Sequence, residues 1–190
     1  MPITVLLSQA LGLNILFSAG SMITICCAET EAHFQDAHEL MAEFRAWDSA
    51  QTEKAGLDPN EFLDFYYRSG DSKFPGIYAP PEGCLLLATH LHDAAGCIAF
   101  QRMTPDICEI KRMYVREKFR GMRIGVKLVQ ELISKARAAG YGTMRLETTT
   151  FMQAAIAVYS SLGFMTRTPY YTIPQNFNGV TVFMELDLRA

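Results

Sequence analysis

The sequence predicts a mixed α/β fold in which part of the sheet is parallel. Two apolar runs, 84–91 and 96–103, are separated by four polar or small residues, which is typical of an antiparallel hairpin. The second half of the chain then alternates strand-like and helix-like segments, a pattern that favours parallel strands joined by crossover helices. A length of 190 residues with 49% hydrophobic side chains is enough for one domain with a sizeable core.

The first half of the chain is predicted to form one strand and two helices before the hairpin. Residues 23–28 are short, apolar and rich in β-branched side chains, which indicates a strand. Residues 31–54 carry apolar side chains at helical spacing, and Asp58 followed by Pro59 is typical of the start of a second helix. Glycine and proline then mark a loop over 69–83, long enough to be a candidate binding loop. One face of the long helix would carry Phe34, Ala37, Leu40, Met41 and Phe44.

In the second half, residues 107–115 are predicted to be a strand with polar side chains on both faces. Strict alternation would put one set of its side chains on the same face, namely Ile107, Glu109, Lys111, Met113 and Val115. A basic, glycine-containing loop over 116–125 leads into a helix that Gly140 ends. Beyond it we expect a strand over 143–148, a helix over 152–162, and strands over 164–168 and 180–186.

The apolar N-terminus resembles a leader or an anchor only superficially. No lysine or arginine precedes residues 3–19, and the first positive charge of the chain is Arg45, so the basic region of a secretory leader is missing. The stretch also falls short of the ~20 apolar residues of a membrane helix. We interpret 1–21 as an extension of uncertain status and 22–190 as the domain, and we do not expect a membrane role.

Charge and cysteine usage limit the class of protein further. The net charge is −3, from 17 basic and 20 acidic residues, which excludes the strongly basic surface of a dedicated nucleic-acid-binding protein. The five cysteines contain no Cys-x-x-Cys pair, so free thiols and a cytoplasmic location are the expectation. His90 and His92 share a strand end without a third ligand, and we predict no metal site.

The most informative segment is 111–127, where seven basic residues stand against Glu117 alone. A strand, a glycine-containing loop and a helix start together present unpaired backbone N–H groups and the positive end of a helix dipole, as a pyrophosphate requires. Glycine at 121 and 125 would allow close approach of a phosphate to the backbone. From these residues alone, an ordinary solvated basic loop is an equally good interpretation.

The surrounding motifs resemble the GCN5-related N-acetyltransferase (GNAT) superfamily. Residues 120–125, Arg-Gly-Met-Arg-Ile-Gly, match its signature Arg/Gln-x-x-Gly-x-Gly/Ala, except that Arg123 replaces the middle glycine. Residues 154–164, AAIAVYSSLGF, match a second hallmark, a helix with a tyrosine followed by Leu-Gly-Phe. The resemblance implies an α+β fold: a mixed, mostly antiparallel twisted sheet flanked by helices on both faces. It also implies acetyl-CoA as co-substrate.

The resemblance further implies roles for individual residues. Tyr159 would be the general acid and Glu109 the general base, with Glu147 in reserve. From the residues alone, Tyr159 could instead be a core aromatic, and Glu109 could form a salt bridge with Lys111 or Arg145. Coenzyme A would be held by Met113, Tyr114, Val115, Arg120, Gly121, Met122, Arg123, Ile124 and Gly125.

The function implied is transfer of an acetyl group to a primary amine of a small molecule, directly and within a ternary complex. Two alternatives stay open: a protein amino group as acceptor, and a non-catalytic acyl-CoA-binding module, which Arg123 and Met152 (asparagine in many relatives) would allow. If the acidic helices over 29–64 border the acceptor site, they favour a cationic amine. No nucleic-acid partner is expected, and a homodimer is compatible with the sequence, which does not determine the oligomeric state.

Overall fold

The computed structural model describes residues 23–67 and 74–190. The predicted extension 1–21 and part of the loop predicted over 69–83 therefore lie outside the described residues. The described strands form one seven-stranded sheet with the order β1-β2-β3-β4-β5-β7-β6. Their bounds are β1 Ile23–Cys27, β2 Cys84–His90, β3 Asp93–Arg102, β4 Ile107–Val115, β5 Thr143–Thr149, β6 Met165–Arg167 and β7 Thr181–Asp187.

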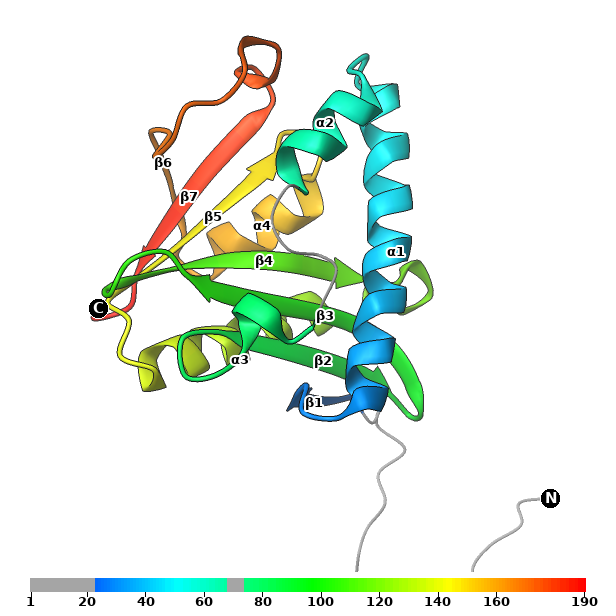
Figure 1. Ribbon diagram of the computed structural model, residues 1–190, viewed down its shortest axis with the longest axis vertical. Helices are drawn as coiled ribbons and strands as arrows, with labels where there is room; N and C mark the ends of the chain where they lie inside the picture. The colour runs from blue at the N-terminus through cyan, green and yellow to red at the C-terminus, as the bar shows by residue number, and fades with distance from the viewer. Residues whose placement is uncertain (1–22, 68–73) are drawn as a thin grey trace, which may run out of the picture.

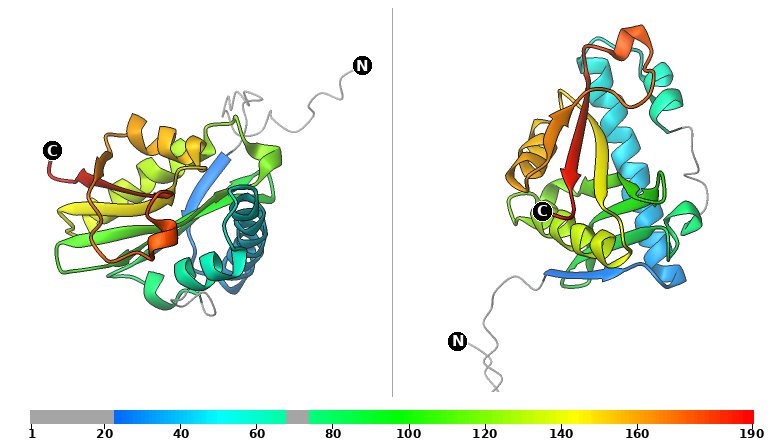
Figure 2. Two further views of the ribbon diagram at one scale, coloured as in Figure 1. Left: turned by 90° about the horizontal axis from the view of Figure 1, so that it is seen from above. Right: turned by 90° about the vertical axis from the view of Figure 1, so that its left-hand side faces the viewer.

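The sheet is mostly antiparallel, with one parallel pair, β4 and β5. Helices flank it on both faces: α1 and α2 lie on one side and α3 and α4 on the other (Figures 1 and 2). This arrangement confirms the predicted mixed α+β fold. The helices are α1 Glu31–Lys54, α2 Pro59–Tyr66, α3 Ile124–Ala138 and α4 Gln153–Ser161.

The helix boundaries follow the capping signals of the sequence. Thr30 caps α1 by accepting a hydrogen bond from the His33 N–H, and Asp58 caps α2 by accepting from Asn60 and Glu61. Just after the C-terminal ends of α3 and α4, Gly140 and Gly163 adopt the left-handed conformation, with φ of 88° and 92°. The predicted ends of these helices are thus confirmed to within two residues.

The two faces of the sheet bury separate hydrophobic clusters. The larger cluster packs α3 and α4 against the sheet, and its fully buried members include Leu128 and Leu132. The smaller cluster packs α1 against the opposite face through Ala37, Leu40 and Met41. Burial of apolar area on both faces therefore holds β2 and β3 between helices, whereas the buried side chains of β5 belong to the larger cluster only.

Strands β4 and β5 separate partway along their length, and we call the place where they separate the seam. The two strands pair only over Ile107–Glu109 and Thr143–Arg145, and Figure 1 shows them diverging from that end. From Ile110 onward, the β5-facing edge of β4 therefore has no strand partner among the described residues. Backbone N–H and C=O groups at such an edge are available to a ligand.

A β-bulge in β4 places the later side chains of this strand on other faces of the sheet than predicted. Arg112 has φ of 61°, and the pairing of β4 with β3 shifts register there. Because the bulge inserts one residue, Met113 and Val115 pack on the α3 face with Ile110 rather than on the face of Glu109. Strict alternation of side chains along 107–115 is thus wrong beyond Lys111.

The hairpin between β2 and β3 is tighter than predicted. A four-residue turn over 92–95 was predicted, but the turn consists of two residues, Leu91 and His92, because β3 already begins at Asp93. Leu91 adopts φ of 59° in this turn. All five cysteines are free thiols, as predicted, and Cys84, Cys97 and Cys108 are buried. Among residues 23–67 and 74–190, no helix combines the length and apolar character that crossing a lipid bilayer requires.

Candidate active site

The segment between β4 and α3 presents a row of free main-chain donors. The N–H groups of residues 121–126 make no hydrogen bond to any described residue, and the first backbone bond of α3 runs from Lys127 N to Arg123 O at 3.2 Å. These donors stand at the positive end of the helix dipole, where an anion is favoured. The predicted phosphate-binding geometry is therefore present in the backbone.

The free donors border the larger of two adjoining cavities, which we call the basic cleft. It has a volume of about 440 Å³ and lies between the end of β4, the start of α3 and the start of α4. Eight of the nine predicted coenzyme A residues line it; Met122 does not, and is 39% exposed. The lining is Phe44, Trp47, Met113, Tyr114, Val115, Phe119, Arg120, Gly121, Arg123, Ile124, Gly125, Val126, Phe151, Met152, Gln153, Ala154, Ala155 and Val158.

Trp47, the one tryptophan of the chain, forms part of the cleft wall. The Arg120 guanidinium lies 5.5 Å from the centre of its ring, a cation–π contact, while its Nε donates to the Val115 carbonyl. Trp47 could not be recognised from the sequence, because only the tertiary position of α1 brings it to the cleft.

The backbone is strained at Arg123, the residue before α3. It adopts φ of 61° and ψ of 20°, the left-handed conformation that glycine tolerates best, and its side chain makes no capping bond. We expect Arg123→Gly to raise the free energy of unfolding by up to about 1 kcal/mol, and Arg123→Val to lower it by about 1 kcal/mol, because β-branched residues tolerate this conformation least. Urea unfolding measures both, and a less stable glycine variant would contradict the assignment of strain.

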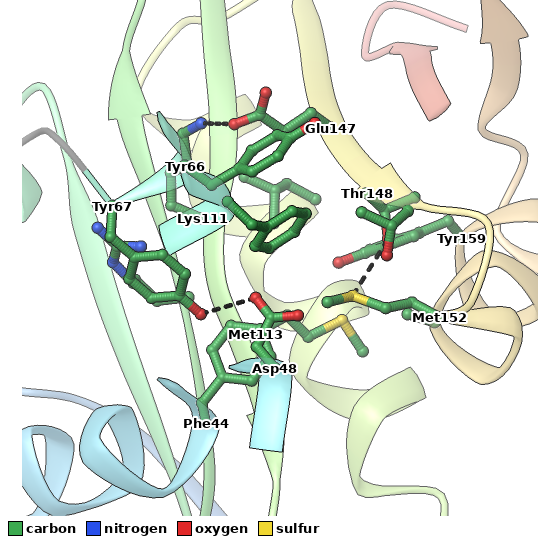
Figure 3. A pocket seen from close by; sticks show the side chains of 15 residues that line it. Phe44, Asp48, Tyr66, Tyr67, Lys111, Met113, Glu147, Thr148, Met152 and Tyr159 are labelled. Atoms are coloured by element: carbon green, nitrogen blue, oxygen red, sulfur yellow. Dashed lines mark hydrogen bonds and ion pairs between the residues drawn. The ribbon is translucent and has the colours of Figure 1, made fainter. Parts of the chain in front are cut away.

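A smaller cavity of about 90 Å³, which we call the small pocket, adjoins the basic cleft at the point where β4 and β5 separate. The two cavities share Phe44, Met113, Met152 and Ala155. Figure 3 shows polar side chains converging on it from α1, β4, β5 and α4. Its lining is Phe44, Asp48, Phe62, Tyr66, Tyr67, Ile110, Lys111, Arg112, Met113, Glu147, Thr148, Thr149, Met152, Ala155 and Tyr159.

Tyr159 contributes a hydroxyl to the small pocket from α4, as Figure 3 shows. The residue is only 4% exposed, and its ring packs on Phe164 with 5.5 Å between ring centres. Burial raises the pKa of the hydroxyl above its ordinary value, so it keeps its proton throughout the neutral range. Tyr159 is therefore a packed aromatic residue with a protonated hydroxyl at a cavity, and its role as general acid stays a prediction.

Glu109 lies outside both cavities and is fully engaged by neighbours. It is 4% exposed, and its carboxylate accepts hydrogen bonds from Tyr170 Oη at 2.7 Å and from Gln101 Nε2 at 3.1 Å. Lys111 Nζ lies 3.2 Å from Oε2, the oxygen that also accepts from Gln101, so of the two salt bridges considered the one with Lys111 is formed. These contacts make Glu109 a structural anchor for the C-terminal loop and for Lys111.

Glu147 on β5 does line the small pocket. Its Oε1 pairs with Lys111 Nζ at 2.5 Å, whereas its Oε2 is buried with no hydrogen-bond partner among the described residues. Burial raises the pKa of this carboxyl above its ordinary value, although the Lys111 charge opposes the shift. The carboxylate that faces the cavity is thus the one that the sequence placed in reserve.

Asp48 was not singled out from the sequence, where the acidic residues over 29–64 could form either a solvated face or a border of the acceptor site. It is 3% exposed; its Oδ2 accepts from Tyr67 Oη at 3.0 Å, and its Oδ1 is buried without a partner among the described residues. Burial raises the pKa of the carboxyl to about 6. Of the other acidic residues on this helix, Glu39 and Glu43 pair with Arg116, away from the small pocket.

The buried carboxyl of Asp48 should make stability depend on pH. Because its pKa rises from 3.8 to about 6 on folding, its ionisation opposes folding above pH 6 and this penalty disappears as the pH falls towards 4. We expect Asp48→Asn to raise the free energy of unfolding by about 1–3 kcal/mol at pH 8, and to change it little at pH 4. Urea unfolding at both pH values measures the difference; an equal effect at both would contradict it.

The side chains around Asp48 that could alter this titration come from three neighbouring elements. Tyr67 follows α2, Lys111 and Arg112 belong to β4, and Glu147 belongs to β5. Among the described residues no cation forms a salt bridge with Asp48, so the hydrogen bond from Tyr67 is the contact that favours its charged form.

Comparison with known proteins decides the family. The family model described as Acetyltransferase (GNAT) family matches residues 34–164, more than half of the chain. The chain belongs to the GNAT family. The predicted resemblance is thereby confirmed, and five of the six residues of the signature segment 120–125 line the basic cleft.

Relatives of known sequence carry similar names. An uncharacterized N-acetyltransferase of Schizosaccharomyces pombe is 42% identical over 51% of this chain and 61% of its own length. An uncharacterized N-acetyltransferase of Dictyostelium discoideum is 45% identical over 44% of this chain and 38% of its own length. An IAA acetyltransferase of Azospirillum brasilense is 34% identical over 58% of this chain and 71% of its own length. The match thus spans less than two thirds of the first two relatives.

Solved structures share the GNAT fold. A Klebsiella pneumoniae protein assigned as an acyl-CoA N-acyltransferase has a TM-score of 0.64 and 29% identity, over 89% of this chain and 99% of its own. A GNAT family acetyltransferase of Elizabethkingia anophelis with acetyl-CoA bound has a TM-score of 0.53 and 21% identity, over 87% of this chain and 97% of its own.

Two departures from the GNAT pattern have structural explanations. Arg123 keeps the left-handed backbone that the usual glycine would adopt. Met152 stands at the N-cap of α4, where an asparagine side chain could accept from the first turn; here it makes no capping bond, and its sulfur accepts from Thr148 Oγ1 at 3.5 Å. Its side chain instead lies where the two cavities meet.

The remaining predictions concern residues away from the cavities. Tyr170 and Tyr171 pack edge-on against Phe183 and line neither cavity. His90 packs its ring against Phe119. Within the described part of the chain, no group of three His, Cys, Asp or Glu side chains is arranged to hold a metal ion.

Proposed function

We propose that the protein is an acetyl-CoA-dependent N-acetyltransferase that moves an acetyl group directly to a primary amine of a small molecule. The observation that carries this proposal is that the two cavities adjoin: Met113, Met152 and Ala155 line both the basic cleft and the small pocket, whose wall also contains a tyrosine and carboxylates. A donor in one cavity and an acceptor in the other would meet there without a covalent intermediate on the protein.

Acetyl-CoA suits the basic cleft for chemical reasons. Its pyrophosphate matches the free N–H groups of residues 121–126 and the charges of Arg120 and Arg123. Its pantetheine arm is an extended chain of amides, which can pair with the open edge of β4 beyond Ile110. The acetyl-CoA bound to the Elizabethkingia anophelis neighbour supports the same donor.

In the proposed acetyl transfer, each polar group of the site acts in one step. The amine nitrogen attacks the thioester carbonyl carbon, and the new C–N bond gives a tetrahedral oxyanion, which N–H groups near Met113 would stabilise. Glu147 takes the proton from the amine, directly or through water, and its raised pKa makes it a stronger base than an exposed carboxylate. The C–S bond then breaks, and Tyr159 gives its proton to the departing thiolate.

In this proposal Glu109 is a positioning residue. It shares Lys111 with Glu147, so the three side chains form one charge network across the seam between β4 and β5. Lys111 keeps its charge there: burial acts to lower its pKa, but the two carboxylates outweigh burial and raise it above the ordinary value. Glu109 thereby holds Lys111, and through it Glu147, in place.

A small-molecule acceptor fits the dimensions of the small pocket better than a protein does. Its volume is about 90 Å³, and aromatic rings from α1 and α2, including Phe44 and Phe62, form part of its wall. A protein acceptor would have to thread a flexible chain end past these rings. The alternative acceptor, a protein amino group, is tested with N-terminal peptides in the same assay.

The test is amine-dependent release of coenzyme A. The purified protein is mixed with acetyl-CoA and a panel of primary amines, free thiol is measured, and the acetylated amine is identified by mass spectrometry. We expect intersecting lines when initial rates are plotted at several concentrations of both substrates, as a ternary complex requires. Tight binding of acetyl-CoA without amine-dependent release would support the non-catalytic binding module instead, and parallel lines would contradict direct transfer.

A further inference from the structure

Two carboxylates in the wall of the small pocket each have only one of their two oxygens hydrogen-bonded. Asp48 and Glu147 both have one oxygen that is hydrogen-bonded and one buried oxygen with no partner among the described residues. They come from different elements, α1 and β5, and Figure 3 shows them on different sides of the cavity. Leaving a buried carboxylate oxygen unpaired is costly, so two such carboxylates in the wall of one cavity indicate a ligand with two donor groups.

The contacts of Asp48 leave its free oxygen directed into the cavity. Tyr67 binds the other oxygen, and the Tyr67 ring is itself held between Arg45 and Arg112, whose guanidinium carbons lie 5.5 and 5.2 Å from its centre. Both arginines thus contact the ring, and no salt bridge to Asp48 is present in the described chain. In Figure 3 the free oxygen of Asp48 points towards the side of Met113 and Met152.

The rest of the pocket wall favours a cation beside Asp48. The rings of Phe44, Phe62, Tyr66 and Tyr67 all line the cavity, and aromatic faces attract alkylammonium groups. An ammonium also has several N–H donors, enough to bind the carboxylate and one further acceptor, whereas a hydroxyl has only one. An ion pair to a carboxylate as buried as Asp48 is worth more than the same pair at the surface.

We propose that Asp48 binds a second, positively charged nitrogen of the acceptor, so that the protein prefers small diamines to monoamines. The reacting amine would lie beside Glu147 and Tyr159, and the second ammonium would pair with Asp48 Oδ1 across the cavity. This inference rests on the proposed function for the place of the reacting amine. It adds the substrate class, which neither the GNAT fold nor the basic cleft determines.

Binding to the coenzyme A complex tests the inference without turnover. The protein is saturated with coenzyme A, and 1,4-diaminobutane and 4-amino-1-butanol are titrated separately by calorimetry; the two ligands differ only in the second nitrogen. We expect the diamine to bind at least about tenfold more tightly than the amino alcohol, as a charge-assisted hydrogen bond implies. We expect this preference to fall to within about twofold in Asp48→Asn.

Two controls separate the possible failures. Glu53→Gln removes one negative charge from an exposed position of the same helix and should keep the preference, which excludes a long-range effect of charge. Coenzyme A affinity measured on each variant shows whether the fold and the basic cleft are intact. In turnover, Asp48→Asn should raise KM for the diamine about tenfold while kcat changes less than about twofold.

The outcomes distinguish this inference from the proposed function. If wild-type protein does not bind coenzyme A, the proposed function fails. If it binds coenzyme A and acetylates amines but shows no preference for the diamine, or keeps the preference in Asp48→Asn, the inference alone is overturned. No binding of the diamine to the coenzyme A complex would also overturn it.

Discussion

Replacing Tyr159 by phenylalanine is expected to lower kcat by about 10²- to 10³-fold while the affinity for acetyl-CoA stays within about twofold. The hydroxyl is the protonated group on α4 that faces the small pocket, and its loss would leave the departing thiolate without a proton donor. Phenylalanine keeps the ring and therefore its packing on Phe164. Steady-state kinetics and calorimetry on the same preparation measure the two effects.

A matched control exists in the same fold. Tyr141 is also buried, but its hydroxyl donates to the Glu82 carbonyl, away from both cavities. Tyr141→Phe should leave kcat within about twofold and lower stability by about 1 kcal/mol through the lost hydrogen bond. A Tyr159→Phe variant with nearly wild-type kcat would show that the tyrosine is only a core aromatic.

The second large effect is expected for the carboxylate that takes the amine proton. Glu147→Gln should lower kcat by about 10²-fold, because glutamine keeps the shape but cannot accept a proton. The raised pKa of Glu147 should place the acidic limb of the kcat/KM profile above the ordinary range of an exposed glutamate, and this limb should disappear in the variant. Rates measured from pH 5 to pH 9 would test both expectations.

Glu109→Gln provides the comparison. It keeps the contact with Tyr170 but removes a charge that holds Lys111, so we expect lower stability and a smaller fall in kcat, with the acidic limb retained. If instead Glu109→Gln abolishes the acidic limb and Glu147→Gln does not, Glu109 is the base and the assignment made from the cavities is wrong.

The elements of this fold were predictable because local signals agree with the tertiary structure. The caps at Thr30 and Asp58 and the glycines after α3 and α4 define helix ends within the chain itself. The bulge at Arg112 was not predictable, because one extra residue in a strand leaves the alternation pattern unchanged until its partner strand is known. That one residue moves Met113 to the face where the cavities meet.

The candidate site likewise contains some residues that a sequence motif identifies and others that only the tertiary structure brings together. The predicted coenzyme A residues of the basic cleft lie close together in the sequence, within 113–125, so a motif could identify them. The small pocket instead collects short groups of residues from α1, α2, β4, β5 and α4, which no one motif spans. Asp48 has the sequence spacing of a surface acidic residue, and only the packing of Tyr67 and α2 against α1 makes it a buried pocket residue.

Trp47 allows the central claim to be measured directly. As the one tryptophan of the chain and part of the wall of the basic cleft, it should report occupancy of that cleft through its fluorescence. Titration with acetyl-CoA and coenzyme A is predicted to change the emission saturably at micromolar concentrations, and the change should weaken in Arg120→Glu. No change with acetyl-CoA, or equal responses to ATP and NAD, would mean that the cleft is only a general anion site and would contradict the acetyltransferase assignment.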